Sequence, residues 1–256
     1  MKLTKAQTKL HQEAMSLVNL DRPLTDDERD FVFQNYHEGS RHNVTASGAF
    51  FTPLDLAMDL TLEIPSNAWI IDLCAGIGIL SYAASAVCDP ERVICVESDQ
   101  EYCRIGKRLQ PNACWIQSNV FDFQSIALPG YSRDNAVVLS NPPFGALPKL
   151  NYDGPNLPFH HSVIQHAAFL ADFGVFILPT TETGYRRNSL KQYSRDDSAS
   201  YYRFAASTGL DLRLSCLDAS YYANDWRHKV PSVEVVTCEL AAARSRQSGF
   251  ARQIAA

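Results

Sequence analysis

The stretch that decides the fold is residues 68–97, AWIIDLCAGIGILSYAASAVCDPERVICVE. Its two short apolar runs, Ala68–Leu73 and Arg92–Val96, predict buried strands, and residues 79–86 between them have a helical pattern. A glycine-containing turn separates the first strand from the helix. Strands that alternate with helices at this spacing are typical of a parallel sheet, so this stretch predicts an α/β fold.

The same alternation continues to residue 240. Further strands are expected at Cys114–Gln117, Ala136–Ser140, Val175–Pro179, Leu212–Leu217 and Val233–Leu240. Further helices are expected near residues 99–109, 160–171 and 198–208. The short connection 218–232 has no helical period, so the last two strands should form an antiparallel hairpin at one edge. The sequence thus predicts a doubly wound, mostly parallel seven-stranded sheet, Rossmann-like, with an antiparallel C-terminal edge hairpin.

A helical extension is expected ahead of the sheet. Residues 6–20 have an amphipathic pattern, and Thr25–Glu28 has the spacing of a capping box. Thr52-Pro53 has the pattern of a helix cap followed by proline at the first helical position. We therefore expect three parts: the N-terminal helical extension 1–48, the α/β domain 49–241 and a mobile C-terminal tail 242–256.

The composition is that of a globular protein. Hydrophobic residues make up 46% of the chain, but no apolar run approaches the ~20 residues of a membrane span. The N-terminus also lacks the apolar core of a signal peptide, so we expect a cytoplasmic protein with no membrane partner. The seven cysteines are scattered without a C-x-x-C pair, which argues against disulfides and zinc. His160, His161 and His166 have no carboxylate or cysteine at ligand spacing, so no metal site is expected.

The charge is unevenly distributed. The chain has a net charge of −5, which divides into −1 for residues 1–50, −7 for 51–179 and +3 for 180–256. Binding to phosphates depends on local patches rather than on the total charge. The net charge therefore neither excludes nor favours a nucleic acid as partner, and the oligomeric state is left open.

The turn Asp72–Gly78 is the strongest sign of a cofactor. Two glycines at a strand-to-helix turn let the backbone approach a ligand closely. Position 81 is Ser, where a dinucleotide-binding turn has a third glycine, so the turn does not favour a dehydrogenase. Glu97 ends the second strand, where a carboxylate can accept hydrogen bonds from both hydroxyls of a ribose.

A second motif, Asn141-Pro142-Pro143-Phe144, follows the fourth strand. Two prolines stiffen the backbone and leave its carbonyls free, and Asn141 adds a side-chain acceptor. An amine conjugated with an aromatic ring is a poor nucleophile. Two acceptors, Asn141 and the Pro142 carbonyl, would pull on its N–H bonds and make its lone pair available, while Phe144 stacks on the ring. The motif predicts binding of a planar amine.

Together these motifs resemble a known family. FFTP (50–53), DLCAGIG (72–78), VESD (96–99) and NPPF (141–144) resemble, in this order, class I S-adenosylmethionine-dependent amino-methyltransferases of the gamma type, which methylate the N6 of adenine in DNA. The resemblance covers residues 45–180 and implies that 49–241 is a methyltransferase catalytic domain. It implies S-adenosylmethionine as cofactor and Asn141, Pro142, Pro143 and Phe144 as the catalytic residues.

The resemblance also implies a cofactor site. Thr52 and Pro53 would hold the methionine carboxylate, Glu97 the ribose, and Ser98 would lie beside the adenine. Where the family has a Gly-Asp pair after the third strand, this chain has Ser118-Asn119, so the Asn119 carbonyl would accept from the adenine amine, with Asp122 as a possible substitute. The full set implied is Phe51, Thr52, Pro53, Asp72, Cys74, Ala75, Gly76, Gly78, Glu97, Ser98, Asn119, Val120 and Asn141.

Residues 145–159 and 180–197 are two turn-rich segments that follow expected strands, where substrates bind in open α/β sheets. The second interleaves basic and aromatic residues, which suits phosphate contact and base stacking, although a solvated surface loop has the same composition. The expected nucleic-acid-binding residues are Lys149, Arg186, Arg187, Lys191 and Arg195.

The substrate is the open choice. A motif of this kind serves adenine in DNA, adenine in RNA and glutamine in proteins, and we expect DNA first. A compact DNA enzyme could read its site with the two turn-rich segments and the N-terminal helices after flipping the base out of the duplex. No proline precedes a cysteine, which argues against cytosine C5 methylation. A partner subunit with this fold but without catalysis is a further alternative, although an intact NPPF argues against it.

Overall fold

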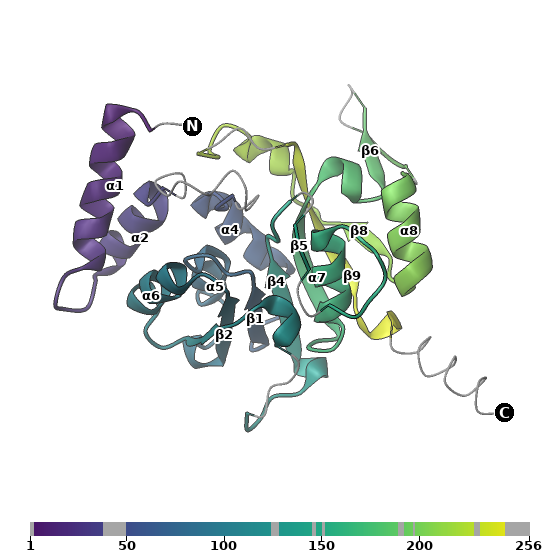
Figure 1. Ribbon diagram of the computed structural model, residues 1–256, viewed down its shortest axis with the longest axis horizontal. Coiled ribbons are helices and arrows are strands. Elements are labelled where there is room, and N and C mark those ends of the chain that lie inside the picture. The colour runs from purple at the N-terminus through teal and green to yellow at the C-terminus, as the bar shows by residue number, and fades with distance from the viewer. Residues whose placement is uncertain are drawn as a thin grey trace.

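A seven-stranded sheet forms the centre of the computed structural model (Figure 1). Its strands are β1 Trp69–Leu73, β2 Val93–Glu97, β3 Cys114–Gln117, β4 Ala136–Ser140, β5 Phe173–Pro179, β8 Leu212–Leu214 and β9 Val233–Glu239. They lie in the order β3-β2-β1-β4-β5-β9-β8. Neighbours from β3 to β5 are parallel, and β9 is antiparallel to both β5 and β8. The predicted fold class is confirmed, with β8 as the edge of the hairpin.

The structure describes residues 3–37, 50–123, 128–144, 147–149, 152–188, 192–196, 198–227 and 231–243. Within these ranges, none of the helices has both the length and the apolar character that a bilayer span requires. The predicted tail 242–256 lies outside the described residues except for its first two positions.

Helices cover both faces of the sheet. One face carries α4 Leu54–Leu60, α5 Ile79–Ala84 and α6 Gln100–Leu109, and the other carries α7 Phe159–Ala167 and α8 Ala199–Thr208. Side chains alternate between the two faces along each buried strand, so Ile70 of β1 packs in the first hydrophobic cluster and Ile71 in the second. The remaining short helices are η2 Thr61–Glu63, η3 Pro90–Arg92, η4 Val120–Asp122, η5 Arg133–Asn135, η6 Thr180–Glu182 and η7 Ala219–Tyr222.

The N-terminal helices α1 Lys5–Val18 and α2 Asp26–Asn35 pack against the sheet domain rather than apart from it (Figure 1). Each begins with a capping box, and the one at Thr25 is the one predicted from the sequence. Their buried residues belong to the same hydrophobic cluster as α4–α6. Arg108 of α6 also donates hydrogen bonds to three backbone carbonyls between residues 18 and 22.

The structure differs from the sequence-based expectation at Thr52, in the segment 180–197, and in the expected strand Leu212–Leu217, which is confined to Leu212–Leu214. Thr52 does not cap α4: the N-cap is Pro53, without a side-chain hydrogen bond, and the Thr52 hydroxyl accepts from another residue described below. The segment 180–197, expected to be irregular, contains η6 and a hairpin of β6 Tyr185–Arg187 and β7 Tyr193–Arg195. Side chains stabilise this hairpin across its strands: the Arg195 guanidinium lies 4.5 Å from the centre of the Tyr185 ring.

Candidate active site

A cavity of about 540 Å³ opens where the parallel strands β1, β2 and β4 end. The predicted residues that line it are Phe51, Thr52, Asp72, Cys74, Ala75, Gly76, Glu97, Ser98, Asn119, Val120, Asn141 and Pro143. Pro53, Gly78, Pro142 and Phe144 were also predicted but do not line it. The structure therefore brings the four separated sequence motifs together at one edge of the sheet, as expected for ligand sites of open α/β folds.

The glycine turn forms the floor of the cavity. Cys74, Gly76 and Gly78 all have positive φ angles, of 58°, 58° and 90°. A Cβ atom on Gly76 would lie 2.8 Å from Cε1 of Phe51, so only glycine allows this approach. A Cβ on Gly78 would instead meet Gln110, at 2.3 Å, on the side away from the cavity. Gly76 thus shapes the cavity, and Gly78 allows the helix to pack.

Two buried carboxylates flank the turn. Glu97 accepts hydrogen bonds from the backbone N–H groups of Gly76 and Asp99, both at 2.8 Å, and burial raises its pKa. Asp72 is 1% exposed and accepts one hydrogen bond from the Ser81 N–H at 3.1 Å. Its other oxygen, Oδ1, has no hydrogen-bond partner in the described part of the chain. Burial, reinforced by the charge of Glu97, raises the pKa of Asp72 to about 7.

The lining of the cavity carries acidic side chains without a basic counterpart. Asp72, Glu97 and Asp99 line it, and none of the described lining residues is Lys, Arg or His. Buried carboxylates without a cation favour a ligand that brings positive charge. S-adenosylmethionine has a sulfonium and an ammonium group against one carboxylate, so the residues present fit this cofactor.

Asn141 has a fixed orientation at the rim of the cavity. Its side-chain Nδ2 donates to the backbone carbonyl of Phe50 at 2.7 Å and to Oγ1 of Thr52 at 3.0 Å. Thr52 therefore serves as an acceptor for Asn141 rather than as the helix cap. Because both bonds use the amide nitrogen, the Oδ1 atom is the group of Asn141 that remains to accept from a ligand.

Ser140 precedes Asn141 in the chain, and Phe144 ends the NPPF motif. The strand end before it is held by Ser140, whose hydroxyl donates to the Leu73 carbonyl at 2.6 Å. The Phe144 ring lies outside the cavity lining, with ring centroids 6.2 Å from Phe50 and 6.4 Å from His160. Phe144 thus packs in the wall beyond Asn141 rather than over the cavity.

Asn119, at the far end of the cavity, already has a local partner. Its Oδ1 accepts from the Phe121 N–H at 3.0 Å, so a ligand amine would have to use the second lone pair of this oxygen. The proposed substitute Asp122 is exposed and does not line the cavity. Tyr102, which we did not predict, does line it, and it packs edge-on against Phe51 at 5.2 Å. Tyr102 lies in the first turn of the helix that follows VESD, and this position could have predicted its contact with the cavity.

The predicted phosphate-binding arginines have partners within the chain. Arg186 is 72% exposed on its side chain and pairs with Asp196 at 2.8 Å. Arg187 is mostly buried and pairs with Asp218 at 2.6 Å. The first of these remains accessible to a ligand, whereas the second has the surroundings of a structural ion pair.

Two other predicted basic residues, Arg195 and Lys149, also have partners within the chain. Arg195 pairs with Asp211 at 2.5 Å, and Lys149 donates to the backbone carbonyl of Leu157. Lys191 lies outside the described residues. The structure therefore gives these side chains intramolecular contacts and does not test their predicted contact with nucleic acid.

The histidines of α7 have a carboxylate partner that the sequence analysis did not find. Glu182 of η6 lies against His160 and His161, although it follows them by some twenty positions. The statement that no carboxylate partners these histidines is therefore wrong, because chain folding rather than sequence spacing brings Glu182 to them. His166 instead contacts the Phe123 backbone carbonyl at 2.7 Å.

The mostly parallel seven-stranded sheet with its antiparallel hairpin matches a Rossmann-like methyltransferase fold. A protein described as a modification subunit of a type I restriction enzyme from Vibrio vulnificus YJ016 matches with a TM-score of 0.56 and 13% identity, over 86% of this chain and 51% of its own. One described as an RNA methyltransferase from Pyrococcus horikoshii has a TM-score of 0.49 and 18% identity, over 91% and 98%. The 23S rRNA methyltransferase ErmE has a TM-score of 0.48 and 10% identity, over 75% and 69%.

No protein-family model matches the chain, and no curated protein sequence does. At identities this low, the likeness to solved structures establishes the fold alone. What the chain does must therefore be argued from its own site.

Proposed function

We propose that this protein transfers a methyl group from S-adenosylmethionine to the N6 amine of adenine, with DNA as the substrate. The observation that carries the proposal is the orientation of Asn141. Its amide nitrogen donates to Phe50 and Thr52, which leaves its oxygen to accept a hydrogen bond from a substrate amine. The cavity with its buried carboxylates lies directly beside it.

The residues of the site act by positioning and polarisation. The adenine amine is a weak nucleophile because its lone pair is conjugated with the ring. Asn141 Oδ1 and the Pro142 carbonyl, accepting from its two N–H bonds, draw the nitrogen toward a tetrahedral geometry and make the lone pair available. S-adenosylmethionine supplies the activated methyl group when it is bound. Thr52 is a positioning residue, because it acts on the amine only through Asn141.

The cofactor would be held along the cavity floor. Gly76 allows the backbone to approach the ligand. Glu97 Oε1 accepts from Asp99 and Ser98. Its Oε2 accepts from Gly76 and retains a lone pair that can accept from a ribose hydroxyl. Asp72 and Glu97 together favour the cationic sulfonium form over the neutral product. That preference supports both binding of the cofactor and release of the product.

DNA is proposed as the substrate from the order of the four motifs, which is that of the gamma arrangement. The acceptor pair at Asn141 suits any planar conjugated amine, so adenine in RNA is the second candidate. A glutamine side chain in a protein presents the same type of amine. The assay must therefore offer all three.

The test is transfer of tritium from labelled S-adenosylmethionine to unmethylated DNA, total RNA and a protein extract. The proposal expects label in DNA, recovered after digestion as N6-methyl-2′-deoxyadenosine. Asn141→Ala should lower turnover by roughly 10²–10³-fold while cofactor affinity stays nearly unchanged. The exposed Asn112→Ala is the matched control and should leave both unchanged.

Each other outcome has a defined meaning. Label in RNA or protein would overturn the proposed substrate but keep the chemistry. Absence of label from all three, with cofactor binding intact, would contradict the proposal of an enzyme that acts alone. Equal turnover by Asn141→Ala would remove Asn141 from the catalytic residues.

A further inference from the structure

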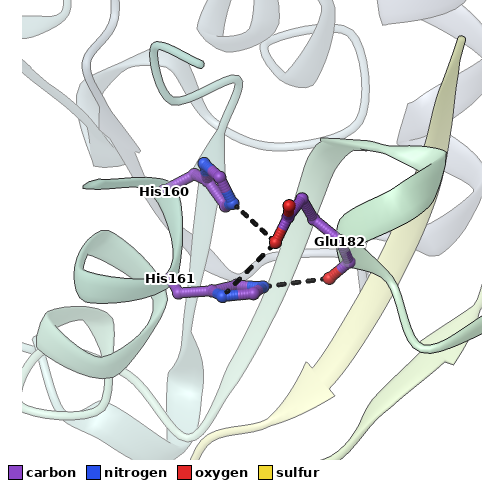
Figure 2. Close-up of side chains that lie close together, drawn as sticks. All are labelled: His160, His161 and Glu182. Carbon is purple, nitrogen blue, oxygen red and sulfur yellow. Dashed lines mark hydrogen bonds and ion pairs between the residues drawn. The ribbon is translucent and has the colours of Figure 1, made fainter. Parts of the chain in front are cut away.

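Two adjacent histidines and a glutamate form a compact cluster behind the active-site wall. His160 and His161 come from the first turn of α7, and Glu182 from η6 after β5 (Figure 2). His160 Nε2 lies 3.5 Å, and His161 Nδ1 3.9 Å, from the same carboxylate oxygen, Oε2 of Glu182. One ligand atom from each residue falls within 4.8 Å of the other two.

Both imidazole groups are buried, and three of their four nitrogens lack a hydrogen-bond partner among the described residues. His160 is 4% exposed and His161 is 0% exposed. Among the described residues, neither nitrogen of His160 nor Nδ1 of His161 has a hydrogen-bond partner. Buried polar nitrogens are nearly always satisfied in proteins. Two of these atoms, His160 Nε2 and His161 Nδ1, face the same Glu182 carboxylate and require an explanation.

The tautomer of His161 determines what its Nδ1 atom can bind. Its Nε2 lies 2.9 Å from the backbone carbonyl of Glu182, so this nitrogen must carry the hydrogen and donate it. In the neutral ring Nδ1 then has a bare lone pair, which points at the Glu182 carboxylate (Figure 2). Two acceptors that face each other repel unless a cation lies between them.

We propose that His160, His161 and Glu182 bind a divalent transition-metal ion, for which Zn²⁺ is the probe. A tetrahedral site with bonds of about 2.0–2.1 Å separates its ligand atoms by roughly 3.3 Å. The observed nitrogen–oxygen distances of 3.5 and 3.9 Å are close to this value, and all three ligand atoms lie within 4.8 Å of one another, so binding would draw the side chains closer together. Imidazole nitrogen with one carboxylate is a donor set that suits zinc, and water completes the fourth position.

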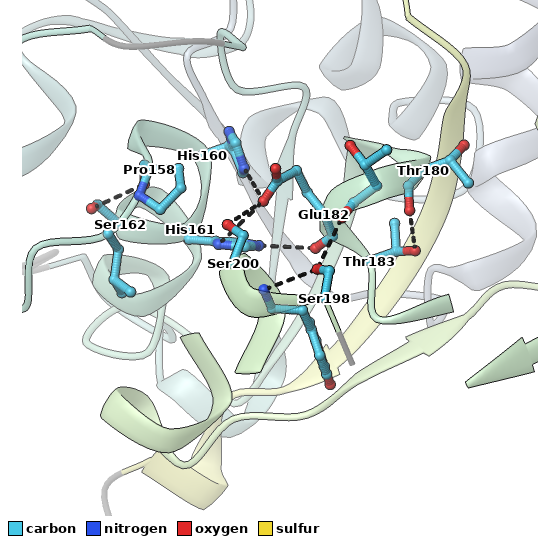
Figure 3. A network of polar contacts seen from close by, with 12 residues as sticks. Pro158, His160, His161, Ser162, Thr180, Glu182, Thr183, Ser198 and Ser200 are labelled. Atoms are coloured by element: carbon cyan, nitrogen blue, oxygen red, sulfur yellow. Dashed lines mark hydrogen bonds and ion pairs between the residues drawn. The ribbon is translucent and has the colours of Figure 1, made fainter. Parts of the chain in front are cut away.

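The surroundings have the features of a metal site. The His161 ring is held by the Glu182 carbonyl in the way that a second hydrogen bond orients most metal-bound histidines. Ser200 donates to Glu182 Oε2 at 2.6 Å and so fixes the carboxylate (Figure 3). The Glu182 side chain is 21% exposed, which provides a route for the ion to enter.

A bound ion would join three segments that are distant in the sequence: α7, η6 and, through Ser200, α8. It would also hold the His160 ring against which Phe144 of the NPPF motif packs. The inferred role is structural: the ion stiffens the wall beside the candidate active site without contacting the reacting groups. The inference does not depend on the proposed methyl transfer.

The test is metal binding by the full-length protein after treatment with a chelator. We would add Zn²⁺, remove free metal by gel filtration and measure zinc per chain, and then follow Co²⁺ binding by its visible absorption. The expected result is one equivalent of zinc and a Co²⁺ spectrum of a four- or five-coordinate site. Glu182→Gln and His161→Asn should each weaken binding by at least roughly 10-fold.

His166→Gln is the matched control. It removes a buried histidine of the same helix whose ring contacts Phe123 and lies outside the cluster, so zinc binding should persist. Zinc should also raise the thermal midpoint of the parent and of His166→Gln but not that of Glu182→Gln. Less than a tenth of an equivalent of zinc in the parent, or equal zinc affinity in Glu182→Gln, would overturn the proposal in favour of a proton-bridged histidine–carboxylate pair.

Discussion

The burial of Asp72 predicts an unusual dependence of stability on pH. The carboxyl group has an ordinary pKa of 3.8, and burial raises it to about 7 in the folded protein. The folded state therefore holds a proton that the unfolded state has released over this interval. By linkage, the stability contributed by Asp72 is fully present below the lower pKa and is lost as pH rises through the higher one.

The expected size follows from the shift. About three pKa units at 1.36 kcal/mol each amount to roughly 4 kcal/mol, with little reduction by solvent because the side chain is 1% exposed. Asp72→Asn keeps an oxygen to accept from the Ser81 N–H and removes the titration. Relative to this variant, the ligand-free parent protein should lose up to about 4 kcal/mol of unfolding free energy between pH 4 and pH 8.

The measurement is urea denaturation of parent and variant at intervals from pH 4 to pH 8 without ligand. The difference between the two curves isolates Asp72, because the other groups titrate in both proteins. The exposed Asp153→Asn serves as control and should follow the parent. Parallel curves for the parent and Asp72→Asn would refute the inference that burial raises the pKa of Asp72 in the folded protein.

Three further variants address the glycine turn, Asn141 and the N-terminal helices. Gly76→Ala should weaken S-adenosylmethionine binding at least roughly 10-fold in calorimetry, because its Cβ would lie 2.8 Å from the Phe51 ring at a φ of +58°. Thr52→Val should lower kcat by about 5- to 10-fold, since Asn141 loses one of its two acceptors, and Thr52→Ser should restore kcat. Arg108→Met should lower the unfolding free energy by roughly 1–3 kcal/mol in urea denaturation, because three carbonyls lose their donor.

Each of these has a result that would contradict it. Unchanged cofactor binding in Gly76→Ala would mean that the turn does not contact the ligand. A Thr52→Ser variant as slow as Thr52→Val would show that the hydroxyl does not orient Asn141. Unaltered stability of Arg108→Met would mean that the hydrogen bonds of Arg108 do not help to hold the N-terminal helices.

The architecture was accessible from the sequence because its signals are local. Buried strands such as Ala136–Ser140 are continuous apolar runs, and the capping box at Thr25 is a pattern of four residues. The motif residues could be grouped because parallel strands end at the same edge of a sheet. The features that the sequence did not predict depend on contacts between side chains that are far apart in the chain.

Thr52 illustrates this limit, since its pattern is that of a helix cap, whereas its hydroxyl accepts from Asn141, 89 positions away. Glu182 meets His160 and His161 for the same kind of reason. The sequence of the arginine-rich segment showed its positive charge, but it did not predict that aspartates would pair with Arg186, Arg187 and Arg195. Local patterns therefore located the site, and tertiary contacts decided what each residue does in it.

The position of β9 has a consequence for how the chain acquires its structure. This strand is the last one in the sequence among the described residues, yet it lies between β5 and β8. Until it emerges from the ribosome, β5 presents an unpaired edge along its whole length. β9 therefore has to insert between two strands that precede it in the chain, and until it does, the edge of β5 is open to pairing with another molecule.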